Sequence, residues 1–292
     1  MPSRKIQLAL PSIPTIEGAG VHLKRAFGSA QLPQFDPFLM LDDFHSANPA
    51  AYRAGFPWHP HRGIETITYL LEGRVEHGDS MGNQGIIGAG DVQWMTAGSG
   101  VIHQEMPRES PTGTLWGFQF WANLSAGRKM TPPRYQEVKA AEIPVVTLSA
   151  GVTAKVIAGT VNGVQGPVTD IVIAPEMLDL TIPAGTGYEH PVPGGHTAFV
   201  YILSGEACCD ESGQWRRRET VLLFDREGDV VKIETRHEPV RVVLVSGKPL
   251  GEPVAWGGPI VMNTREELDL AFKEYEQGTF IKQQNLSTGA AS

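Results

Sequence analysis

Two histidines, His59 and His61, stand two residues apart in the segment GFPWHPHRGIETITYLLEG. Successive side chains of a β-strand point to opposite faces, so both imidazoles would point the same way. Further along, in MTAGSGVIHQEMP, His103 and Glu105 repeat this spacing. Three imidazoles and one carboxylate form a mixed nitrogen and oxygen set that suits a first-row divalent metal ion. The spacing therefore predicts one metal site between two strands, with its remaining positions open to water and substrate.

The elements that must position these side chains are short apolar runs separated by Gly, Pro, Asn and Asp. This pattern is typical of strands in an all-β sandwich or barrel. We expect strands at residues 66–71, 91–97, 115–124, 154–159, 171–176, 178–183, 198–203, 220–224 and 240–247.

The chain also contains a weak internal sequence repeat. YLLEGR at residues 69–74 resembles YILSGE at residues 201–206, and GAGDVQWM near residue 88 resembles REGDVVKI near residue 226. Two matches in the same order indicate a duplicated β unit. We therefore predict two domains in tandem, residues 1–135 and 136–292.

One helix is expected near the end, in NTREELDLAFKEYEQG. Thr264 and Glu267 have the spacing of a capping box, in which each side chain satisfies a backbone amide at the helix start. Leu268, Phe272 and Tyr275 recur at helical spacing, and Gly278 is a plausible stop. We place this helix in the second domain, followed by a flexible tail, NLSTGAAS, that has no periodicity.

The two histidine segments together resemble the paired motifs of cupins in the form found in the pirin family. Three further segments resemble pirins as well: KMTPPRYQ, YILSGE and GGPIVMNTREELDLAFKEYEQGTF. The resemblance covers most of the chain. It implies an all-β fold of two cupin-type, jelly-roll β-barrels with a short C-terminal helix, and a metal in the N-terminal barrel alone.

The resemblance also implies which residues bind the metal. The family's iron ligands fall on His59, His61, His103 and Glu105. We expect one divalent ion, Fe(II) first, with Zn, Mn, Ni or Cu as alternatives. The family implies two possible functions. One is a quercetin 2,3-dioxygenase acting on a flavonol and O2, with Glu105 as the candidate base. The other is a non-catalytic, metal-bound regulator that acts through a protein partner.

Two further groups of residues need a decision. Glu65 is a ligand in many cupins, but a bend at Gly63 would turn it from the histidine face, so we assign it a supporting or structural role. In the second copy, alignment on YILSG puts Pro191 and Pro193 at the histidine positions, and alignment on the Gly-Asp pair puts Arg241 at the position of His103. The second barrel is therefore expected to be degenerate, with His190, His196 and His237 in loops or at the surface.

Composition excludes several classes of protein. A formal net charge of −8 argues against direct binding of nucleic acid, which relies on clustered Lys and Arg. No apolar run approaches the roughly 18 residues of a membrane helix, and no signal peptide is evident, so we expect a cytoplasmic protein with no membrane partner. Cys208 and Cys209 are adjacent and cannot join distant segments by a disulfide.

Overall fold

The computed structural model describes residues 1–29, 34–108, 111–171 and 173–282. The chain divides by contacts into two compact units. Unit 1 consists of residues 1–15, 23–43 and 138–251, and unit 2 of residues 16–22, 44–137 and 252–292. Among the described residues, each unit holds two larger sheets of antiparallel strands, the arrangement of a jelly-roll barrel. The all-β, two-cupin fold expected from the sequence is confirmed.

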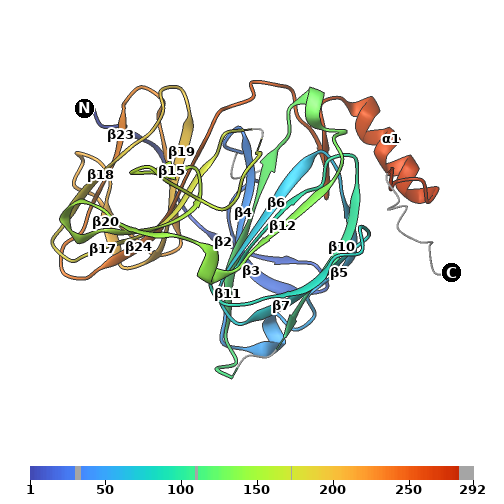
Figure 1. Cartoon of the computed structure of the whole chain (residues 1–292), viewed down its shortest axis with the longest axis horizontal. Helices are drawn as coiled ribbons and strands as arrows, with labels where there is room; N and C mark the ends of the chain where they lie inside the picture. Colours follow the sequence, from blue (N-terminus) through green and yellow to red (C-terminus); the bar gives the residue numbers. More distant parts are fainter. Residues whose placement is uncertain (30–33, 109–110, 172, 283–292) are drawn as a thin grey trace. The chain divides into compact units, whose positions relative to one another are not determined.

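Unit 1 contains a seven-stranded sheet in the order β1-β22-β19-β24-β17-β14-β13 and a four-stranded sheet in the order β18-β23-β20-β21. Its strands are β1 (Ile6–Pro11), β13 (Val145–Thr147), β14 (Thr153–Ala158), β17 (Glu176–Ile182), β18 (Gly187–Pro191), β19 (Thr197–Ser204), β20 (Glu206–Cys208), β21 (Trp215–Arg217), β22 (Thr220–Phe224), β23 (Val230–Glu234) and β24 (Val240–Gly247), with the pair β15 (Thr160–Val161) and β16 (Val164–Gln165) and the 3₁₀ turns η3 (Ala140–Glu142) and η4 (Ser149–Gly151). Figure 1 labels β17, β19 and β24 of the seven-stranded sheet and β18, β20 and β23 of the four-stranded sheet.

Unit 2 contains a four-stranded sheet in the order β5-β10-β7-β8 and, in a second sheet, the run β12-β9-β6-β11. Its elements are β5 (Phe56–His61), β6 (Ile64–Glu72), β7 (Arg74–Asp79), β8 (Gln84–Ile87), β9 (Val92–Thr96), β10 (Val101–Arg108), β11 (Leu115–Asn123), β25 (Ala255–Gly257), β26 (Ile260–Met262), α1 (Arg265–Glu276), η1 (Pro49–Ala51) and η2 (Ala126–Arg128). Strand β12 (Arg134–Val138) ends at the first residue of a unit 1 segment, and β2 (Ile13–Glu17), β3 (Val21–Phe27) and β4 (Phe38–Ser46) each contain residues of both units.

The strands form because their side chains separate by face. In β10, buried and half-buried residues alternate from Val101 to Pro107, so that His103 and Glu105 are both turned inward. Strand β6 is buried at both faces over most of its length, and it lies between β9 and β11 in its sheet. Its β-branched and aromatic residues, as in TITY, suit that position.

Helix α1 begins and ends as its sequence predicts. The Thr264 side chain accepts from the Glu267 amide, and the Glu267 carboxylate accepts from the Thr264 amide, which confirms the capping box. Gln277 is the C-cap, and Gly278 follows with a φ of +71°, a conformation that favours glycine. Among the described residues, no helix is long and apolar enough to cross a membrane.

The duplication is visible in the topology, but one of its two sequence anchors is wrong. YLLEGR lies at the β6–β7 connection and YILSGE at β19–β20, with Gly73 and Gly205 both at positive φ. In contrast, the first Gly-Asp pair precedes β9, which pairs with β6, whereas the second precedes β23, which pairs with β18. The counterpart of β9 is β22, which pairs with β19. Arg241, in β24, therefore does not occupy the position of His103.

Two other expectations differ from the structure. Of the described residues within 171–176, only Glu176 is in a strand, because Ala174 has a φ of +45° and Pro175 cannot donate a hydrogen bond to a sheet. The units also group the chain differently from the contiguous division at residues 135 and 136: residues 1–15 belong with unit 1, and the helix belongs with unit 2. The tail at residues 285–292 lies outside the described residues.

Candidate metal centre

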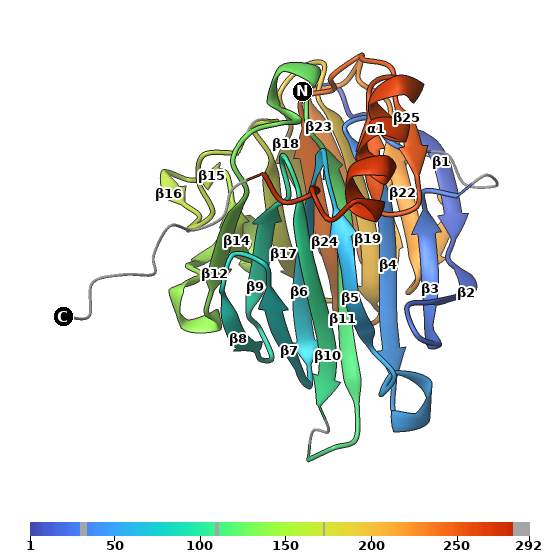
Figure 2. The same cartoon turned by 90° about the vertical axis from the view of Figure 1, so that its right-hand side faces the viewer.

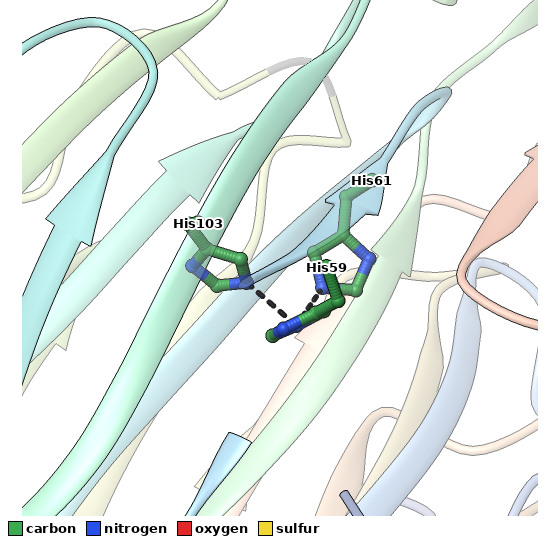
Figure 3. A group of neighbouring side chains, drawn as sticks. All are labelled: His59, His61 and His103. Atoms are coloured by element: carbon green, nitrogen blue, oxygen red, sulfur yellow. Dashed lines mark hydrogen bonds between the residues drawn. The ribbon is translucent and has the colours of Figure 1, made fainter. Parts of the chain in front are cut away.

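Three histidines converge inside unit 2 (Figure 3). Strand β5 supplies His59 and His61, β10 supplies His103, and the antiparallel register places His103 directly opposite His59. The Nε2 atom of His59 lies 3.1 Å from Nε2 of His61 and 2.9 Å from Nε2 of His103. The candidate ligand atoms of all three lie within 4.8 Å of one another. Two adjacent strands thus bring three imidazole nitrogens to one point, as the spacing predicts.

Backbone carbonyls determine which nitrogen of two rings carries the proton. Nδ1 of His59 lies 2.8 Å from the Pro57 oxygen, and Nδ1 of His61 lies 3.0 Å from the Pro259 oxygen. A carbonyl oxygen only accepts, so each Nδ1 donates, and Nε2 of a neutral ring is left with a lone pair. Two such lone pairs therefore face each other, and a cation between them would be the natural partner. The donor set fits a metal ion.

Burial keeps two of the three rings neutral. Burial, together with the neighbouring His59, lowers the pKa of His61 to about 3. Burial likewise holds the pKa of His103 well below its usual range, with added effects of His61, His59 and His77. The neutral imidazole is the form that binds a metal. These two side chains are therefore in the metal-binding protonation state at neutral pH.

Glu105, the fourth expected ligand, is buried but does not belong to this cluster of three. The strand register shifts between His103 and Glu105, so that Glu105 lies opposite Phe56 of β5. Its Oε1 accepts from Thr68 Oγ1 at 3.0 Å and its Oε2 from Gln119 Nε2 at 2.8 Å. Each carboxylate oxygen has two lone pairs, which leaves acceptor capacity for a metal or a substrate proton. Coordination by Glu105 stays a prediction.

The partners of Glu105 lie on the facing sheet of the barrel. Thr68 of β6 and Gln119 of β11 are directly opposite each other in their register, and Gln119 Nε2 also donates to Thr68 Oγ1 at 2.9 Å. Trp121 Nε1 in turn donates to Gln119 Oε1 at 3.0 Å. The Trp121 ring stands edge-on to His61, with centroids 5.1 Å apart. Gln119 and Trp121 therefore connect Glu105 to the histidine cluster.

Glu65 also lies outside the cluster, in agreement with a structural role. It is fully buried in β6, where its Oε1 accepts from Thr96 Oγ1 at 2.7 Å. Burial raises the pKa of this carboxyl group, and the hydrogen bond from Thr96 acts in the opposite direction.

The sequence interpretation missed a neighbouring pair, His77 and Asp79 of β7. Both are buried, and His77 Nε2 lies 3.2 Å from Asp79 Oδ2. The His77 ring lies 5.5 Å from that of His103 and stacks on Tyr135. The signal was present, since EHGD again places a histidine and a carboxylate two residues apart. The contribution of Pro259 had no such signal, because its carbonyl meets a side chain 198 positions away.

The corresponding place in unit 1 is built differently. The inward-facing residues of β18 and β23 are Tyr188, His190, Val231 and Ile233. The sequence suggested that His190 lies in a loop or at the surface. Instead it is buried, in strand β18. Its Nδ1 lies 2.9 Å from the Tyr188 hydroxyl, and its Nε2 contacts the Glu176 carboxylate. Two of the four inward positions are aliphatic and cannot bind a metal.

Comparison with known proteins agrees with this architecture. The family model described as Pirin matches residues 20–122, and that of the Pirin C-terminal cupin domain matches residues 177–281. The chain is 43% identical over 285 residues to a pirin-like protein of Caulobacter vibrioides, covering 96% of this chain and 100% of that protein.

Solved structures give the same result. A crystal structure of quercetin 2,3-dioxygenase from Acinetobacter baumannii matches with a TM-score of 0.86 and 32% identity, covering 95% of this chain and 98% of that one. Bacterial pirin YhhW from Escherichia coli, solved in complex with nickel(II), matches with a TM-score of 0.65 over 83% of this chain and 99% of that one; at 19% identity this likeness concerns the fold alone. On both family models and these relatives, the chain belongs to the pirin family.

Proposed function

We propose that this protein is a metal-dependent dioxygenase that opens flavonol rings of the quercetin type with O2. The site would be mononuclear, with His59, His61, His103 and Glu105 as ligands. The observation that carries the proposal is the convergence of three imidazoles on one point, with the Nδ1 protons of His59 and His61 turned away toward backbone carbonyl oxygens. The likeness to the Acinetobacter baumannii quercetin 2,3-dioxygenase supports the choice of reaction.

The residues of the site would divide the work. The three imidazoles would hold the ion without adding charge, and Glu105 would contribute one negative charge. A bound divalent metal supplies Lewis-acid chemistry, lowering the pKa of a coordinated hydroxyl group. Glu105 is the candidate base for the 3-hydroxyl proton of the flavonol. Thr68 and Gln119 would keep its carboxylate in place, since each oxygen receives one hydrogen bond from them.

We propose Fe(II) as the native ion, by the family's pattern of ligands. A set of imidazoles with one carboxylate also accepts Zn, Mn, Ni or Cu, because such sites follow the general affinity order of the first-row metals. The cytoplasmic location expected from the sequence stays a prediction.

Oxygen uptake with quercetin tests the proposal. Wild-type protein should carry close to one metal ion per chain after reconstitution with Fe(II), and should consume O2 in proportion to bound metal. His22→Ala is a matched control, because His22 is an exposed histidine of the same unit. Bound metal without any O2 uptake would reject the enzyme and favour the second possibility, a metal-bound regulator acting on a protein partner.

A further inference from the structure

The C-terminal segment, residues 252–282, lies in the unit that holds the histidine cluster. It forms the hairpin β25–β26 and then helix α1, which Figure 2 shows beside β25. The segment is anchored by a buried apolar cluster, against which Ile102 of β10 also packs. The buried members of that cluster are Ile260, Met262, Leu268, Ala271 and Phe280. The buried residues of α1 thus belong to a cluster that also contacts β10, the strand that carries His103.

The hairpin runs along the histidine motif itself. The Pro259 oxygen lies 3.0 Å from His61 Nδ1, and the Val261 amide donates to the Arg62 oxygen at 3.1 Å. A Cβ atom at Gly63 would lie 1.9 Å from the Val261 oxygen, so that only glycine allows this approach. Three consecutive residues of the motif, His61 to Gly63, therefore contact residues 259–261.

Two buried cationic side chains, Arg62 and Lys129, connect the C-terminal segment to the histidine motif by hydrogen bonds. The Arg62 guanidinium donates to the Ser99 oxygen at 2.8 Å, to Glu274 Oε2 at 2.7 Å and to the Phe280 oxygen at 2.8 Å. Lys129 Nζ donates at 2.9 Å to the Gly63 oxygen and at 2.9 Å to the Val261 oxygen. Glu274 is the acidic partner of Arg62, whose side chain is only 2% exposed.

The hydrogen bond from His61 to Pro259 has a chemical consequence. It holds the proton on Nδ1 and turns Nε2 toward His59, the arrangement in which Nε2 is free to bind a metal. Without that carbonyl, the buried Nδ1 would lack its acceptor, and the ring could reverse or exchange tautomers. The orientation of a candidate ligand thus depends on a residue far along the chain.

We propose that the C-terminal segment is a positioning element of the metal centre. The Pro259 carbonyl fixes the tautomer and orientation of His61, and the Arg62–Glu274 pair holds the segment on the motif. The family model of the C-terminal cupin domain extends to residue 281, and here its last part serves the unit of the histidine cluster. This inference rests on the metal-binding part of the proposed function.

Nickel(II) binding by the full-length, metal-free protein provides the first test. Gly258→Val forces a β-branched residue into the φ of +54° that precedes Pro259, and so displaces the carbonyl. We expect the Kd for Ni²⁺ to rise by about tenfold or more, the usual scale for losing an outer partner of a ligand. Gly213→Val is the matched control, because Gly213 is an exposed glycine of unit 1 with a φ of +69° and open space around it.

A milder variant addresses the ion pair. Glu274→Gln removes the negative charge beside Arg62, whereas Glu276→Gln makes the same change at an exposed position of the same helix. We expect Glu274→Gln to bind Ni²⁺ more weakly than Glu276→Gln, with the latter equal to wild type. The comparison of Glu274→Gln with Glu276→Gln tests the positioning role of the segment even if Gly258→Val does not fold.

A second readout needs no metal. The ¹⁵N chemical shifts of the His61 ring report which nitrogen carries the proton. We expect the Nδ1–H form in the wild type and a mixture in Gly258→Val. If wild-type protein binds no Ni²⁺, the metal-binding function fails and this inference with it. If wild type binds Ni²⁺ and both Gly258→Val and Glu274→Gln bind it equally well, or the His61 tautomer is unchanged, the inference alone is overturned.

Discussion

The positions of protons on single side chains decide what the candidate site can bind. Two carbonyl oxygens hold protons on Nδ1 of His59 and His61, and burial keeps His61 and His103 neutral. In this state the inward-facing nitrogens of His59 and His61 repel one another unless a cation lies between them. The same atoms that would bind a metal are therefore unfavourably placed without one.

Loss of one imidazole should largely abolish metal binding. His61→Ala removes one of three neutral ligands, and the remaining set has too few donors to hold a divalent ion tightly. We expect a fall in affinity of at least about 100-fold, beyond the 10- to 100-fold typical of outer-partner mutations. Elemental analysis after reconstitution measures this, with His22→Ala as control. Equal metal content in His61→Ala and wild type would contradict the assignment.

Glu105 should matter more for turnover than for metal retention. Glu105→Gln keeps the size and one acceptor oxygen, so its contact with Thr68 or Gln119 can persist, but it removes the negative charge and the basicity. We expect a fall in kcat of roughly 100-fold or more, the scale of a lost general base. The measurement is O2 consumption per bound metal with a flavonol at matched loading. Equal rates would remove Glu105 from the chemistry.

A buried carboxyl group in unit 1 should give the free energy of unfolding a distinct pH dependence. Asp43 is 4% exposed and accepts from the Tyr201 hydroxyl at 2.7 Å. Burial raises its pKa to about 6, although the Tyr201 hydrogen bond acts in the opposite direction. The unfolded value is about 3.9, so the folded state holds its proton more tightly between these pH values.

The sign follows from that difference. The contribution of Asp43 to stability is fully present below about pH 4 and is lost as pH rises through about 6. Asp43→Asn keeps an acceptor for Tyr201 but does not titrate. The free energy of unfolding of wild type relative to Asp43→Asn should therefore fall by about 2–3 kcal/mol between pH 4 and pH 7. Urea titrations across this range measure it, and a constant difference would contradict it.

Only part of this chemistry can be predicted from the sequence. Spacing of two along a strand places His59 with His61, and His103 with Glu105, on common faces, and the structure has them there. It does not predict the shift in register that places Glu105 opposite Phe56, nor the distant carbonyl of Pro259. These depend on tertiary contacts that leave no local pattern.

At the level of elements, the helix is the most predictable part. Its capping box and its glycine stop are local features and are both present. The apolar stripe is only partly as expected: Leu268 is buried and Phe272 half-buried, but Tyr275 is 39% exposed. Strand positions follow the apolar runs, except at residues 171–176, where Ala174 and Pro175 prevent pairing.

Two leucines of helix α1 allow the stability contributed by side-chain packing to be distinguished from that of helix propensity. Leu268 is 2% exposed within the apolar cluster, whereas Leu270 is 54% exposed. Leu268→Ala should lower the free energy of unfolding by about 2–5 kcal/mol, the range for a buried leucine. Leu270→Ala should change it by about 0.5 kcal/mol or less. Chemical denaturation compares them, and equal effects would mean that the helix does not pack as described.

At the level of the whole molecule, the two units are not consecutive in sequence. Strand β1 pairs with β22 in unit 1, and the segment from residue 252 onward returns to unit 2. The internal repeat indicates two barrels but does not show which unit each terminal segment joins, because the terminal segments lie outside the repeated motifs. A division at residue 135 therefore separates strands that pair with each other.

Cutting the chain at that point tests the interleaved arrangement. A fragment of residues 1–135 lacks the Pro259 carbonyl and the cluster around Leu268, and a fragment of residues 136–292 lacks β1. We expect neither fragment to unfold cooperatively or to bind Ni²⁺ with wild-type affinity when produced alone. Produced together, they should associate and recover metal binding, since each supplies elements that the other unit requires. Cooperative unfolding and full metal binding by residues 1–135 alone would show that the returning C-terminal segment is dispensable and that the contiguous division describes the folding domains.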